Sequence, residues 1–187
     1  MNYYKVTFDY EKYDHLGVQI KIDDEQIGFN RYIAETGMRI CAKEIVCEDW
    51  AGETYPLDYI PNDQSWPIIS GNAKTIFEQF SYDVEFIPII FGKDNRTVGF
   101  LFNPLNVLSD AIDTGNSIIK QVSRSSPNGQ IAHTMFIKVV LKSSVVGNCD
   151  IFRVADNPMP IYVSERVKRA LSQTGMKGFA FSKVRLT

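Results

Sequence analysis

Short segments in which apolar and polar residues alternate recur along the chain, and this pattern limits the possible folds more than any other sequence feature. It is clearest in residues 5–10, 18–22 and 135–142. A period of two places alternate side chains on opposite faces, so we expect each segment to be a strand with one buried face. Many short strands with two or three short helices among them predict an α+β fold with a mixed or antiparallel sheet.

Serine residues mark the starts of two predicted helices. Ser70 and Ser164 can each accept a hydrogen bond from the first turn of a helix. Apolar residues at spacings of three and four follow both serines: Ala73, Ile76, Phe77 and Phe80 after the first, and Val167, Ala170 and Leu171 after the second. Gly175 lies where a left-handed residue would end the second helix.

Residues 84–91 form an almost continuous apolar run, which predicts a strand buried on both faces. Pro88 lacks an N–H donor, so we expect it at a sheet edge or a bulge. Further short strands are predicted at 97–102, 150–154, 160–163 and from residue 178 onward.

Three segments are less regular. Residues 52–67 contain three prolines and little periodicity, and residues 123–130 are polar, so both are predicted to be loops. Residues 38–50 fit either a helix or a strand.

Charge is spread unevenly along the chain. The 187 residues carry a formal net charge of −2, but residues 1–63 hold 13 acids and 6 bases, a net of −7, and residues 64–187 a net of +5. The length predicts one domain over residues 1–187, in which residues 1–63 form an acidic part. The near-neutral total argues against nucleic-acid binding by the whole chain, although a local basic patch stays open.

Cysteine usage and the N-terminal residues point to the cytoplasm. Cys41, Cys47 and Cys149 are an odd and sparse set, which fits a reducing compartment better than a disulfide scaffold. The first ten residues lack the basic and apolar regions of a signal peptide. No apolar run approaches the ~20 residues of a membrane span.

Few residues suggest catalysis. The chain has two histidines, His15 and His133, and no motif that pairs a nucleophile with a base. Asp110 and Asp113 could act as acid and base or bind a cation, but turn and capping roles are more common for aspartate. The cysteines lack zinc-ligand spacing. We therefore expect no catalytic residue, cofactor or metal.

Several short motifs in the last two thirds of the chain stand in a characteristic order. They are WPIIS at 66–70, DVEFIP at 83–88, LNVL at 105–108, DIFRV at 150–154, PIYVSE at 160–165 and GMKGFAF at 175–181. Together with Asp113 and Ser117 they resemble a bacterial immunity-protein family of polymorphic-toxin systems, typified by a myxobacterial protein. The resemblance covers residues 64–185.

The motif residues have structural explanations. Phe152 is a sheet residue, Ser164 is a helix cap, and Gly175 and Gly178 allow turns. Arg153 stands among apolar residues, so if buried it needs a carboxylate or carbonyl partner. We expect a structural ion pair, with Glu165 or Asp113 as the candidate carboxylate.

The resemblance implies a cytosolic protein that neutralises one toxin encoded beside it, and such an inhibitor needs no catalysis. The acidic N-terminal part further suggests a basic toxin surface. The predicted contacts are Asp23, Asp24, Glu25, Glu48, Asp49, Trp50, Glu53 and Tyr55. Two other hypotheses stay open: a small hydrolase that uses Asp110, Asp113 or His133, and a nucleic-acid-binding module in the basic C-terminal part.

Overall fold

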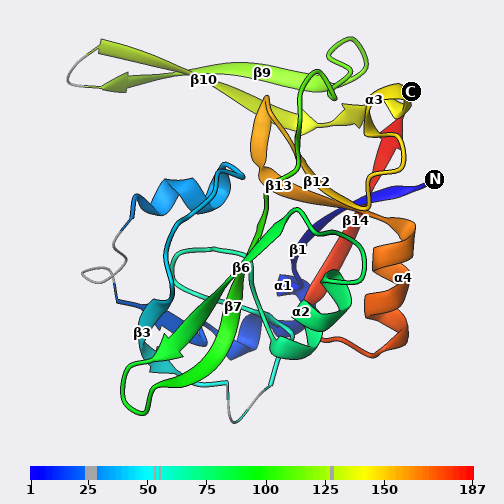
Figure 1. Cartoon of the computed structure of the whole chain (residues 1–187). Coiled ribbons are helices and arrows are strands. Elements are labelled where there is room, and N and C mark those ends of the chain that lie inside the picture. The colour runs from blue at the N-terminus through cyan, green and yellow to red at the C-terminus, as the bar shows by residue number, and fades with distance from the viewer. Residues whose placement is uncertain (24–28, 53, 55, 127–128) are drawn as a thin grey trace.

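Three groups of strands organise the chain (Figure 1). The computed structural model describes residues 1–23, 29–52, 54, 56–126 and 129–187, and for residues 31, 34, 123–126 and 129–133 it describes the backbone alone. Two of the groups are six-stranded sheets, and the third is a two-stranded hairpin.

One six-stranded sheet contains both ends of the chain, and we call it the terminal sheet. In spatial order its strands are β11 (Val140–Leu141), β14 (Phe179–Leu186), β1 (Tyr3–Phe8), β13 (Asn157–Ser164), β12 (Ile151–Val154) and β8 (Val107–Leu108). β1 pairs antiparallel with both β14 and β13, so the first strand of the chain lies between two of the last. This long-range pairing brings the termini together at one side of the molecule (Figure 1).

The other six-stranded sheet is built from residues between the two ends, and we call it the middle sheet. Its spatial order is β2 (Ile20–Ile22), β3 (Ile45–Trp50), β6 (Val84–Phe91), β7 (Arg96–Pro104), β5 (Ile68–Ile69) and β4 (Tyr59–Ile60). β6 and β7 form a long antiparallel pair, and β3 lies parallel to β6. β2 and β4 are therefore the edge strands of this sheet.

The two-stranded hairpin consists of β9 (Ile118–Ser126) and β10 (Gly129–Lys138). Among the described strands, these two pair only with each other. Figure 1 shows them reaching away from both six-stranded sheets at the top of the view.

Helices are short and few. The described residues form four α-helices: α1 (Tyr10–Tyr13), α2 (Gly71–Phe77), α3 (Ser143–Val146) and α4 (Glu165–Gln173). Two 3₁₀ helices, η1 (Asp14–Leu16) and η2 (Arg31–Glu35), accompany them. None of these helices is long and apolar enough to cross a membrane.

The predicted α+β class is confirmed, but the chain is richer in strands than expected, and the expectation of two or three helices is wrong. α2 and α4 begin after Ser70 and Ser164, and both serine side chains accept a backbone hydrogen bond from the first turn, as predicted. α1 and α3 have four residues each, too few to show helical periodicity.

The described residues form three hydrophobic core clusters, and one of them joins the two six-stranded sheets. This joining cluster contains Val6 and Val163 of the terminal sheet and Phe102 of the middle sheet, and α2 and α4 contribute Phe77 and Leu171. A second cluster lies in the middle sheet and includes Trp66, which is 1% exposed. The third lies on the other side of the terminal sheet, around Phe152.

Several strand predictions need correction. In the predicted loop 123–130, residues 123–126 belong to β9 and residues 129–130 to β10, so these residues are strand, and residues 127–128 lie outside the described residues. The segment 52–67 contains the two-residue strand β4, and the ambiguous segment 38–50 ends in strand β3. Tyr10 begins α1 rather than extending β1, since the Asp9 side chain accepts a hydrogen bond from Lys12 N.

The strand over residues 84–91 is confirmed as β6, but it is not buried on both faces. Only Ile87 and Ile89 are buried, and the residues between and beside them are partly exposed. Pro88 is not at a sheet edge, because β6 lies between β3 and β7. Pro88 precedes the pairing with β3, which starts at Ile89, and the register on β7 shifts between Ile89 and Ile90. The irregularity therefore begins one residue after the proline, and the additional residue, Val98, is on β7.

Candidate functional site

Those predicted toxin contacts that the structure describes lie at one edge of the middle sheet. Asp23 directly follows β2, and Glu48, Asp49 and Trp50 end β3, where Asp49 lies opposite Lys21. The other predicted contacts, Asp24, Glu25, Glu53 and Tyr55, lie outside the described residues. The structure therefore brings the described contacts together, and we call Asp23, Glu48, Asp49 and Trp50 the β2–β3 edge.

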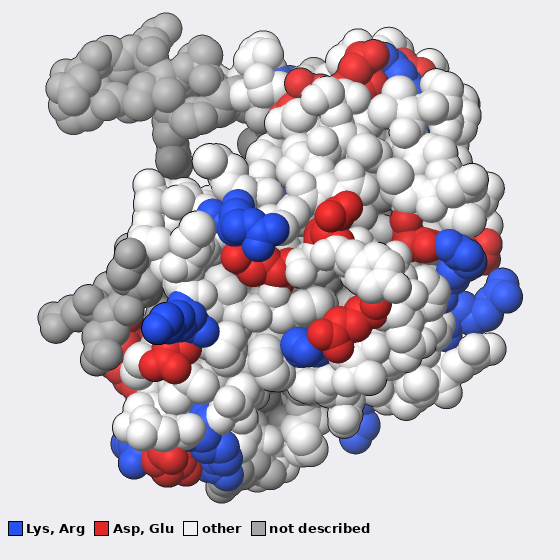
Figure 2. All heavy atoms as spheres, viewed as in Figure 1, with Lys and Arg blue, Asp and Glu red and all other residues white. Residues whose placement is uncertain are grey.

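Basic groups lie close to the acids of the β2–β3 edge. Lys21 Nζ is 2.6 Å from a carboxylate oxygen of Glu48, and Lys93 Nζ is 3.5 Å from one of Asp49. The Glu48 hydrogen bond raises the pKa of Lys21 above its usual value. In Figure 2, acidic and basic groups alternate on the visible face instead of forming a single acidic field.

Trp50 is half-buried beneath a cation. Its ring lies 4.5 Å from the guanidinium carbon of Arg96 and 6.3 Å from the ring of Phe91. A tryptophan held on one side by an arginine is a rigid, amphipathic surface group, the type that commonly anchors protein interfaces.

The motif residues of the terminal sheet have contacts that explain them structurally. Phe152 is fully buried, with its ring 5.5 Å from each of the rings of Tyr3 and Tyr162. Ser164 caps α4 and also donates to the carboxylate of Asp150.

Two glycines of the last motif have left-handed backbone conformations. Gly175 has a φ of 72° and follows α4, as expected for a helix end. Gly178 has a φ of 90°, and a Cβ at this position would collide with the backbone of Tyr59. Gly178 therefore lets the start of β14 approach the middle sheet closely.

Arg153 has backbone carbonyl partners, one of the two kinds expected for a buried arginine, and the two carboxylates expected to pair with it bond to other residues. Arg153 is 1% exposed, and its Nη1 donates to the carbonyls of Pro158 and Met159 at 2.7 and 2.8 Å. Glu165 instead accepts a hydrogen bond from Asn2, and Asp113 accepts two from Asn116. Burial lowers the pKa of Arg153 to about 10, which leaves the guanidinium charged at neutral pH.

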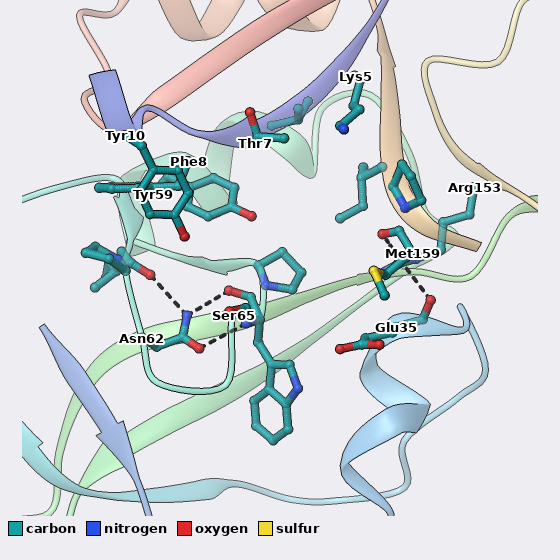
Figure 3. A pocket seen from close by; sticks show the side chains of 17 residues that line it. Lys5, Thr7, Phe8, Tyr10, Glu35, Tyr59, Asn62, Ser65, Arg153 and Met159 are labelled. Carbon is teal, nitrogen blue, oxygen red and sulfur yellow. Dashed lines mark hydrogen bonds between the residues drawn. The ribbon is translucent and has the colours of Figure 1, made fainter. Parts of the chain in front are cut away.

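A cavity of about 350 Å³ lies between the terminal sheet and the segment 59–67 (Figure 3). Figure 3 shows Phe8, Tyr10 and Tyr59 at one end and Glu35, Arg153 and Met159 at the other. Burial raises the pKa of Tyr59 above its usual range, so its hydroxyl stays protonated.

The cavity wall is held in shape by Asn62. Its side chain donates to the carbonyls of Ile60 and Trp66 and accepts from Trp66 N at 2.9 Å. Ser65, which lies between Asn62 and Trp66 in the sequence, has a φ of 58°, a strained conformation for a residue with a side chain. Sequence reasoning missed this cavity, because its lining comes from segments that only the fold brings together.

The residues singled out in the sequence for catalysis lie elsewhere than in this cavity. The described lining contains neither histidine nor cysteine, and its charged side chains are Lys5, Glu35 and Arg153. Asp110 and Asp113 are not among the lining residues. Asp110 pairs with Lys142 at 2.7 Å, and the hydrogen bonds from Asn116 hold the pKa of Asp113 below its usual value. The His133 side chain lies outside the described part of the chain.

Comparison with protein-family models identifies a family for the chain. A family model described as an immunity protein family, Imm11, matches residues 4–185. No curated protein matches the chain. The matched range runs from β1 to β14, and it therefore includes the acidic N-terminal part as well as the motifs of the last two thirds.

Proposed function

The chain belongs to the Imm11 immunity protein family, and from this premise we propose that it binds a cognate bacterial toxin and neutralises it by stoichiometric occlusion. The observation that carries the proposal is the match over nearly the whole chain. An inhibitor of this kind acts where its toxin would otherwise do damage, so we place it in the cytoplasm, beside the targets of a toxin that enters or is made in the cell.

We propose that the chain is not an enzyme. Blocking a toxin requires a complementary surface and no chemical step, and tight protein inhibitors work in this way. The described lining of the cavity contains neither histidine nor cysteine, and Asp110 and Asp113 are engaged in turn and ion-pair contacts.

The β2–β3 edge is our proposed contact surface for a basic region of the toxin, together with its sequence neighbours Asp24, Glu25, Glu53 and Tyr55. Trp50 is the candidate anchor, because its ring is large and already ordered by Arg96 and Phe91. Lys21 and Lys93 would have to give up or share their pairing with Glu48 and Asp49 on binding. Surface pairs of this kind are weak, so exchanging them costs little.

Charge reversal at the edge tests the contact surface. Glu48→Lys should slow association with the toxin encoded by the neighbouring gene, and the effect should shrink at high salt, because exposed charges are screened. Glu78→Lys is the matched control: Glu78 lies on the surface after α2, its side chain is 47% exposed against 46% for Glu48, and each is paired with a lysine. Association rates are measured by surface plasmon resonance.

Equal association rates for Glu48→Lys, Glu78→Lys and the unmodified chain would show that the β2–β3 edge is not a contact surface for the toxin. The immunity function would still stand in that case, provided that the unmodified chain binds the toxin.

A further inference from the structure

The hairpin β9–β10 has two faces of different character. Lys120 lies opposite Met135, and Ile119 lies opposite Phe136. Because side chains alternate along a strand, these two pairs point to opposite faces of the hairpin.

The face that carries Phe136 follows the usual rule of burial. Near the base of the hairpin, Phe136 packs against the core cluster around Phe152. Farther out, Gln121 and Thr134 are exposed, and a 3.1 Å hydrogen bond joins their side chains. Among the described side chains of this face, the apolar ones are therefore partly buried and the exposed ones are polar.

The face that carries Lys120 breaks that rule. Ile118, Val122, Met135 and Ile137 are 49%, 38%, 52% and 51% exposed. Ile137 belongs here because the register shifts between Phe136 and Lys138, which leaves Ile137 and Lys138 across from Ile118. We call Ile118, Lys120, Val122, Met135 and Ile137 the hairpin face.

An exposed apolar face on a strand pair is unfavourable in water unless a partner covers it. A two-stranded hairpin is marginally stable by itself, and contiguous exposed apolar side chains mark interaction sites or aggregation hazards. No described strand pairs with the outer edge of either β9 or β10. A partner that covers the hairpin face would therefore bury apolar area that the chain itself leaves in water.

We infer that the hairpin face is a docking surface for the toxin and that it contacts a toxin patch that is apolar and flanked by acidic groups. The inference rests on the proposed function. Residues 118–138 contain Lys120, Arg124 and Lys138 and no Asp or Glu, so charge complementarity calls for an acidic partner surface. Methionine, here Met135, adapts its shape to a partner and is enriched in interfaces.

The β2–β3 edge and the hairpin face require opposite charges. A toxin that fits both must present a basic region to the first and an apolar, acidic patch to the second. This requirement makes the hairpin face testable separately from the edge.

Two other occupants fit the hairpin face less well. A second copy that docked face to face would bring together two surfaces that both carry positive charge, since residues 118–138 contain three bases and no acid, and like charges repel. Segments that bind membrane interfaces favour tryptophan and tyrosine, and residues 118–138 contain neither.

The test compares substitutions on the two faces of the hairpin. Met135→Gln and Lys120→Glu alter the hairpin face. As controls, Thr134→Gln and Gln121→Glu introduce the same two side chains at neighbouring positions of the opposite face. The dissociation constant for the purified toxin of the neighbouring gene is measured for each, together with the melting temperature. Each hairpin-face variant should raise the dissociation constant by about tenfold or more, and each control by less than about twofold.

The melting temperatures of the two hairpin-face variants should equal that of the unmodified chain, because Met135 and Lys120 are exposed. Those of the two controls should change little, because the hydrogen bond between Gln121 and Thr134 is exposed. Toxin binding with unchanged affinity in both hairpin-face variants overturns the inference and leaves the proposed function intact, whereas no binding by the unmodified chain overturns the proposed function itself.

Two further outcomes would also overturn the inference. One is a dimer of the chain in sedimentation that Met135→Gln abolishes while toxin affinity stays unchanged. The other is binding to phosphatidylglycerol–phosphatidylethanolamine vesicles that Lys120→Glu abolishes, again with toxin affinity unchanged.

Discussion

Arg153 brings a positive charge into the interior and bonds there to the backbone. Its guanidinium joins the carbonyls of Pro158 and Met159 and lies 3.4 Å from that of Glu35, so one side chain ties β12 to β13 and η2. Arg153→Met keeps much of the volume but leaves buried carbonyls without their donor. We expect a loss of about 2–4 kcal/mol in the free energy of unfolding in urea. A loss below about 0.5 kcal/mol would show that these bonds are dispensable.

The three cysteines should differ in reactivity because they differ in burial. Cys41 is exposed, and Cys47 is buried in the middle sheet, where burial raises the pKa of its thiol to about 11. The thiolate is the reactive form and the reagent must also reach the sulfur, so at pH 8 Cys47 should react with a thiol reagent only after unfolding. Cys41→Ser should abolish the fastest phase of labelling. Equal labelling rates for Cys41 and Cys47 in the folded protein would contradict the assignment.

α4 stabilises the molecule through one buried stripe. Leu171 is 1% exposed and packs in the cluster that joins the two six-stranded sheets. Leu171→Ala should lower the free energy of unfolding by about 2–5 kcal/mol, as should Phe152→Ala in β12. Arg169→Ala, at an exposed position of the same helix, should change it by less than about 0.5 kcal/mol. Chemical denaturation checks all three, and a Leu171→Ala protein as stable as the Arg169→Ala protein would refute the core assignment.

Elements with a local signal were predictable from the sequence. The caps Ser70 and Ser164 and the apolar stripes behind them define α2 and α4 without reference to the rest of the chain. Residues 123–130 were not predictable in this way, because Ser, Asn and Gly have low strand propensity. Their pairing across β9 and β10 depends on the opposite strand instead. The same limit applies to Met135, whose alternation predicted a buried face and which is exposed.

At the scale of the whole molecule, the charge count of residues 1–63 did not predict how their acidic side chains are paired in the fold. The net −7 of residues 1–63 suggested an acidic face, yet Lys93 of the β6–β7 turn lies near Asp49, and Arg96 at the start of β7 lies over Trp50. Such pairing depends on tertiary structure and leaves no trace in the sequence. One domain is our proposal for the whole chain, because a single core cluster contains residues from both six-stranded sheets.

The central claim is that the chain neutralises its toxin by binding and without turnover. The most direct measurement is a titration of the toxin encoded by the neighbouring gene with this protein, at toxin concentrations well above the dissociation constant. Residual toxin activity should fall linearly and reach its minimum at one equivalent, and it should recover when the complex is separated. Full protection at far below one equivalent, or toxin that stays inactive after separation, would contradict occlusion and indicate an enzyme.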